Sequence, residues 1–70
     1  MEKLIQFIEY RYTMASFWGA DAEKMLDQAF GALEFYHMEN PDQFDECEKL
    51  WNDVWHPKFL ALVYGGEVNA

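Results

Sequence analysis

The sequence predicts an all-α fold, a compact bundle of three amphipathic helices plus a short C-terminal helix. The chain has 70 residues, of which 51% are hydrophobic and 19% aromatic. It is therefore one small domain, with too many aromatic side chains for a disordered chain. Apolar residues recur at intervals of three and four along most of the sequence, which is the helical period. Residues that break helices divide the chain into four segments, and they lie at Gly19, Asn40-Pro41, His56-Pro57 and Gly65-Gly66.

The first segment, before Gly19, predicts a helix that its neighbours cover on most sides. Its polar residues form one narrow row, at Glu2, Gln6, Glu9, Thr13 and Ser16. Almost all the other residues are apolar, and a helix with so thin a polar stripe is largely buried.

Arg11 is the exception, because it lies in the middle of the apolar arc of this helix. A guanidinium that is buried without a partner is strongly destabilising. We expect either an internal ion pair or a side chain that passes Trp18 to reach water. The alternative is that Arg11 and Trp18 belong to an interface with a partner subunit, since Arg and Trp are frequent in interface hot spots.

The second segment predicts a helix that begins after Asp21, a residue type that caps helix N-termini. Its broad apolar face consists of Ala22, Met25, Leu26, Ala29, Phe30, Leu33 and Tyr36. The opposite face starts polar but then carries a second apolar cluster of Gly31, Phe35 and Met38. If this cluster is exposed, it predicts an apolar partner-binding patch, because exposed apolar patches mark interaction sites. The alternative is that a fourth element covers it.

The third segment predicts a helix capped by Asn40, with Pro41 in its first turn. It is expected to end before Pro57, because the residue preceding a proline disfavours helical angles. A last short helix over residues 58–64 follows, with Gly65 in a left-handed cap. A buried strand would show the same uniformly apolar pattern, but the sequence offers no second strand to pair with it.

These elements predict one helical domain over residues 1–66 and a disordered tail over residues 67–70. Cys47, the single cysteine, is interpreted as a small core residue, because no base lies beside it in the sequence. The rest of the predicted core consists of Leu4, Ile8, Tyr12, Leu26, Phe30, Leu33, Phe44, Trp51, Val54, Phe59 and Leu62.

The protein is predicted to be cytoplasmic and free of membrane contact. One cysteine cannot form an intramolecular disulfide, whereas small secreted domains usually carry paired cysteines. The polar N-terminal residues do not resemble a signal peptide. The longest apolar run, residues 59–64, has six residues, while a membrane span needs about 20.

The 13 acidic and 5 basic residues give a net charge of −8, and this charge is unevenly distributed. Residues 39–53 contain six acids and one lysine, and so carry −5 of the total. One interpretation is a solvated face kept acidic for solubility. The other is a strip that attracts a basic protein partner by electrostatic steering. The predicted contact residues of this strip are Glu39, Asp42, Asp45, Glu46 and Asp53.

In its extreme form, the acidic strip would imitate the phosphate rows of nucleic acid and occupy the groove of a DNA-binding protein. Direct binding of nucleic acid by this chain is not expected, since its charge has the same sign as the phosphates.

Metal binding and catalysis are both disfavoured by the sequence. Glu34 with His37 and Asp53 with His56 have the carboxylate-x-x-histidine spacing of di-iron helical bundles. Those bundles need two further inward carboxylates, and here the inward helix faces are apolar, with His56 expected on a polar side. The sequence shows no nucleophile beside a base, phosphate loop or zinc spacing, and the chain is too small to enclose a pocket of about 300 Å³. No metal or other cofactor is therefore expected.

The sequence thus predicts a small acidic, non-enzymatic protein-interaction module, an adaptor or inhibitor that binds a basic protein surface. The alternative is a structural or self-assembling homodimer, in which a second copy buries the surplus of apolar residues. A metal-dependent enzyme is the least favoured hypothesis.

Overall fold

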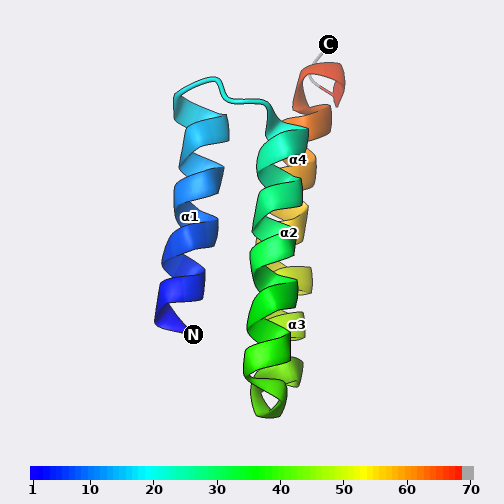
Figure 1. Ribbon diagram of the computed structural model, residues 1–70. Helices are drawn as coiled ribbons and strands as arrows, with labels where there is room; N and C mark the ends of the chain where they lie inside the picture. Colours follow the sequence, from blue (N-terminus) through cyan, green and yellow to red (C-terminus); the bar gives the residue numbers. More distant parts are fainter. Residues whose placement is uncertain (69–70) are drawn as a thin grey trace.

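α1 (Glu2–Phe17) and α2 (Ala22–Glu39) form the first two arms of the computed structural model, which describes residues 1–68 (Figure 1). The third arm, the third rod, is a continuous series of helical turns. It consists of η1 (Pro41–Gln43), α3 (Phe44–Leu50), the π-helical segment η2 (Trp51–Trp55) and α4 (His56–Val68). Residues 1–68 contain no strand, so the all-α prediction is confirmed, and residues 58–64 are helical.

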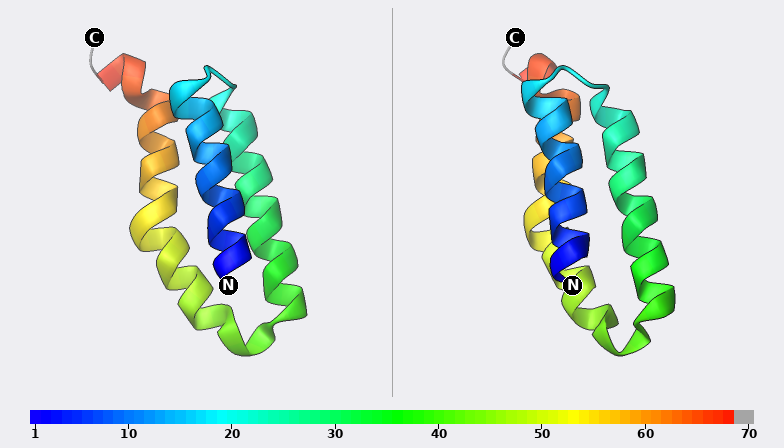
Figure 2. Two further views of the ribbon diagram at one scale, coloured as in Figure 1. Left: turned by 90° about the vertical axis from the view of Figure 1, so that its left-hand side faces the viewer. Right: turned by 60° about the vertical axis from the view of Figure 1, so that its left-hand side comes forward.

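α2 and the third rod form a long antiparallel hairpin, and α1 lies against one face of it (Figure 2). α1 packs mainly on α2 and also contacts α4. Because α1 is shorter than the hairpin, the end where α2 meets η1 extends beyond the N-terminus of α1 (Figure 1). The molecule is therefore elongated, with principal extents of 42, 20 and 16 Å.

The core lies where α1, α2 and the third rod meet. Its buried residues are Leu4, Ile8, Met25, Ala29, Leu33, Cys47, Trp51, Trp55 and Phe59. Tyr12 is half-buried beside them and presents its ring edge-on to Trp55 and Phe59, with centroid separations of 6.1 and 5.5 Å. The prediction that Cys47 is a core residue is confirmed.

The core predicted from the sequence is confirmed in part. Residues predicted there and found buried are Leu4, Ile8, Leu33, Trp51 and Phe59. Residues predicted there and found half-buried are Tyr12, Leu26 and Leu62. The prediction is wrong for Phe30, Phe44 and Val54, whose side chains are 43%, 45% and 37% exposed. Phe30 and Phe44 lie on the side of the hairpin away from α1, so no third helix covers them.

The third helix was expected to end before Pro57 and a separate helix to follow, and this expectation is wrong. The His56 N–H donates to the Trp51 carbonyl, one residue farther back than in an α-helix. In a regular helix, a proline ring clashes with the carbonyl four residues before it. The wider turn of η2 precedes Pro57 and relieves this clash, so the helix continues and only bends there (Figure 2, yellow).

The spacing of the buried residues on the third rod explains why the π-helical turn forms. Cys47, Trp51, Trp55 and Phe59 follow one another at intervals of four. In an α-helix each such step overshoots a full turn by about 40°, so the last residue would lie about 120° from the first. The wider turn of η2 offsets part of this rotation and keeps all four residues on the core side. The same shift leaves Val54 on the outer surface.

The other helix ends agree with the sequence only in part. The Asp21 carboxylate accepts a hydrogen bond from the Lys24 N–H at 3.3 Å, so the predicted cap of α2 is confirmed. Asn40 precedes η1 as expected, but its side chain donates to the Tyr36 carbonyl at 3.2 Å and so closes α2 instead. Gly65 lies inside α4 and does not adopt the expected left-handed cap.

The predicted domain over residues 1–66 and tail over residues 67–70 stay predictions. α4 includes residues 67–68, and residues 69–70 of the expected tail lie outside the described residues.

Candidate interaction surfaces

The acidic face, defined as Glu39, Asp42, Asp45, Glu46 and Asp53, lies on the outside of the hairpin. All five side chains are exposed. Three of them, Asp42, Asp45 and Glu46, occupy the first turns of η1 and α3. Negative charge is favourable there because the backbone N–H groups at a helix start carry partial positive charge.

An apolar hollow lies within this acidic face and was not predicted. Leu50 and Val54 line it together with Lys49, and Glu46 and Asp53 flank it. Leu50 is half-buried, and Val54 is exposed because η2 rotates it away from the core. The face therefore combines carboxylates with aliphatic surface on adjacent turns of one helix.

The apolar patch of Gly31, Phe35 and Met38 is exposed on the outer side of α2. Phe35 is 65% and Met38 is 81% exposed, and a Cβ built on Gly31 would meet no atom within 4 Å. No element of residues 1–68 covers this patch, so the alternative that a fourth element buries it is wrong.

Among the side chains of residues 1–65, Arg11 contacts aromatic rings and forms no ion pair, so the first of its two expected arrangements is not found there. Its guanidinium carbon lies 4.5 Å from the centroid of the Phe7 ring and 5.5 Å from that of Tyr10. One terminal nitrogen donates to the Met14 sulfur at 3.1 Å. Cation–π contacts of this kind stabilise a partly desolvated cation. Trp18 is largely exposed and stands edge-on to Tyr10, with centroids 5.8 Å apart.

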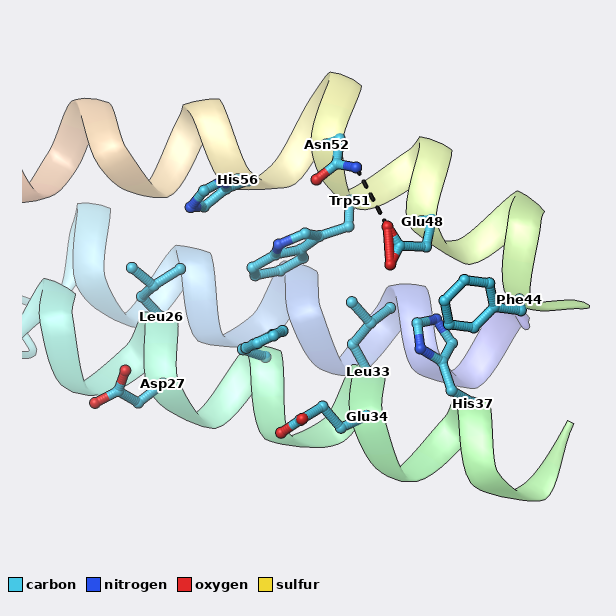
Figure 3. Close-up of a pocket in the computed structure, with 11 residues that line it drawn as sticks. Leu26, Asp27, Leu33, Glu34, His37, Phe44, Glu48, Trp51, Asn52 and His56 are labelled. Carbon is cyan, nitrogen blue, oxygen red and sulfur yellow. Dashed lines mark hydrogen bonds between the residues drawn. The ribbon is translucent and has the colours of Figure 1, made fainter. Parts of the chain in front are cut away.

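A groove between α2 and the third rod was not anticipated from the sequence. It lies on the face of the hairpin away from α1, which is seen behind it in Figure 3. Its volume is about 500 Å³ and it is open to solvent. Its apolar lining consists of Leu26, Phe30, Leu33, Phe44 and Trp51. Its polar lining consists of Asp27, Glu34, His37, Glu48, Asn52 and His56.

Stacked rings bridge this groove from one helix to the other (Figure 3). The Trp51 indole stacks on Phe30 of α2 at 5.8 Å and on His56 of α4 at 5.7 Å, with interplanar angles of 18° and 16°. Nearer the hairpin end, the rings of His37 and Phe44 lie 4.5 Å apart. The rings join the two sides of the groove and give it an aromatic floor.

His56 lies in the groove, so the expectation that it points to a polar side is wrong. It stacks on Trp51, whereas Asp53 lies on the outer acidic face. The carboxylate-x-x-histidine pair of Asp53 and His56 therefore does not form one site with the pair of Glu34 and His37. Among the side chains that the structure describes, those of residues 1–65, no group of three His, Cys, Asp or Glu could hold a metal ion.

Comparison with protein-family models, with curated proteins and with solved structures found no match to this chain. Among residues 1–68, no helix is both long and apolar enough to cross a membrane.

Proposed function

We propose that this protein is a small acidic, non-enzymatic interaction module, an adaptor or inhibitor that binds the basic surface of a partner protein. The observation that carries the proposal is the apolar hollow of Leu50 and Val54 between Glu46 and Asp53. Aliphatic surface adds buried area on association, while carboxylates steer the encounter and fix its register.

In a narrower form of this proposal, the partner is a nucleic-acid-binding protein and the acidic face substitutes for phosphates. Asp42 lies in η1, and Asp45 and Glu46 follow in the first turn of α3, so three exposed carboxylates come within five residues of the chain. This form predicts that duplex DNA displaces the partner, and simultaneous binding of DNA and the module would exclude it.

Affinity capture from the native host, followed by mass spectrometry, tests the proposal. A variant with Asp42→Lys, Asp45→Lys and Glu46→Lys is expected to lose the partner that the natural chain retains. A control with Glu2→Lys, Glu9→Lys and Glu23→Lys, all exposed on other surfaces, changes the net charge equally, from −8 to −2.

Circular dichroism of both variants would show that the helices remain. Retention of the partner by the control together with loss by the acidic-face variant supports the proposal. Equal capture by both variants would contradict it.

A homodimer is the second candidate, and the end of α1 favours it. Tyr10, Phe17 and Trp18 are exposed, the rings of Tyr10 and Trp18 lie 5.8 Å apart, and Arg11 lies over the Tyr10 ring. Aromatic residues and Arg are typical of interface centres. Sedimentation at micromolar concentration would show a dimer that the Trp18→Ser variant weakens. A monomer at that concentration would reject the homodimer.

A further inference from the structure

We propose that the groove between α2 and the third rod is the docking site for an amphipathic helix of the partner, with Lys or Arg residues beside its apolar face. This inference rests on the proposed function and adds to it the place of docking and the kind of element that docks. The partner's helix would take the position of a fourth helix against the hairpin.

The shape of the groove matches a helix. α1 covers one face of the hairpin (Figure 2), and the groove occupies the other face (Figure 3). Along α2 it extends from Leu26 to His37, which is about 16 Å or three helical turns. Two helices that pack together approach to about 8–10 Å between axes. A third helix can then lie in the furrow between them and contact both.

A helix that covers the floor of the groove would bury exposed aromatic surface. Phe30 and Phe44 expose nearly half of their side chains, although both lie beside buried residues. Their rings already contact Trp51 and His37, and such contacts reduce the side-chain freedom that binding would remove. Aromatic side chains that are already ordered are effective anchors for a docked helix.

The negative charge of the groove favours a basic occupant. Asp27, Glu34 and Glu48 line it, and no Lys or Arg is among its lining residues. The Asn52 amide donates to the Glu48 carboxylate at 3.4 Å. A basic helix would place cations opposite these carboxylates. A second copy of this chain, with 13 acids and 5 bases, would mostly bring further carboxylates, so a basic partner fits better than a homodimer here.

A titration followed by nuclear magnetic resonance tests the inference with defined probes. The probes are a panel of helical peptides of about 18 residues (~27 Å), each with a Leu face flanked by Lys and each differing in the spacing of Leu. Matched peptides with Glu in place of Lys serve as controls. We expect the Lys peptides to shift the Trp51 indole N–H and the amides of residues 26–37, and the Glu peptides to have no effect.

Paired variants show whether the groove itself is the binding site. Asp27→Lys with Glu34→Lys is expected to weaken peptide binding by about tenfold or more. Glu9→Lys with Glu23→Lys changes the net charge equally outside the groove and is expected to leave the affinity within about twofold. Phe30→Ser, which removes a ring from the floor of the groove, is expected to weaken peptide binding as well.

Three results would overturn the inference. They are shifts confined to residues outside the groove, equal losses in the groove and control variants, and no binding by any peptide of the panel. Capture of the host partner separates this outcome from failure of the proposed function. If the groove variant retains the partner and the acidic-face variant loses it, only the groove inference fails. If neither variant loses the partner, the proposed function fails as well.

Discussion

Cys47 is completely enclosed between the helices, and this enclosure determines how its thiol ionises. Burial raises the pKa of the Cys47 thiol above its ordinary value, because the thiolate would lie in an apolar environment. Nearby Glu46 acts in the same direction, and the positive N-terminus opposes it. The folded protein therefore holds the thiol proton more tightly than the unfolded chain does.

This pKa shift predicts a loss of stability at alkaline pH. Below the ordinary thiol pKa of about 8.5, both states are protonated and the contribution of Cys47 is fully present. As the pH rises above that value, the unfolded chain ionises first and the free energy of unfolding falls. Urea denaturation at about pH 7.5 and about pH 9.5 should show a larger fall for the natural chain than for Cys47→Ala. Equal falls would contradict this explanation.

At the residue scale, the sequence predicted burial well near the middle of each apolar face and poorly at its edges. Leu4, Ile8 and Leu33 point to a neighbour in any arrangement of the helices, and all three are buried. Phe30 and Phe44 are edge residues whose exposure depends on which side α1 occupies. A helical projection gives the angle of each residue about the axis of its helix, but not the position of the neighbouring helices. The groove could therefore not be predicted.

The third rod shows what periodicity could and could not predict at the scale of an element. The apolar repeat predicts the helix before Pro57 correctly, whereas the proline wrongly predicts an end of the helix there. A signal for the continuous rod was present, because Cys47, Trp51, Trp55 and Phe59 are spaced by four throughout. That spacing does not suit a straight α-helix, and it anticipates a wider turn. The exposed position of Val54, and with it the apolar hollow, depends on that turn.

Replacing Pro57 by alanine tests this account of the rod. A proline in the interior of a regular α-helix costs about 3 kcal/mol relative to alanine. If η2 relieves the clash as described, Pro57→Ala should change the free energy of unfolding by less than about 1 kcal/mol, since Pro also restricts the unfolded chain. Urea denaturation of both proteins provides the measurement. A gain of about 3 kcal/mol or more would mean that the ring is strained in the native rod.

The main feature of the whole molecule is that α1 covers only one face of the hairpin, while the chain carries a large negative charge. Residues 39–53 carry −5 of the net −8, and the groove adds Asp27 and Glu34 on another side. The acidic face and the apolar patch could be proposed from the sequence, because the first lies within residues 39–53 and the second on α2 alone. The groove depends on how helices are placed relative to one another, which composition and period do not specify.

This charge distribution predicts that salt stabilises the fold. Repulsion among the carboxylates opposes the compact state, and salt screens it beyond about 10 Å at 0.1 M. The melting temperature should rise by a few degrees between about 10 mM and about 300 mM sodium chloride. A variant with Asp42→Asn, Asp45→Asn and Glu46→Gln should show a smaller rise. A melting temperature that falls with salt would indicate that favourable ion pairs dominate.

The central claim is that the hairpin of α2 and the third rod, and not α1, carries the partner surface. Amide hydrogen exchange, compared between the free chain and the complex captured from the host, tests this claim most directly. We predict slower exchange in the complex over residues 26–37 and 42–56, with α1 unchanged. Protection confined to α1, where Tyr10, Phe17 and Trp18 are exposed, would contradict the claim.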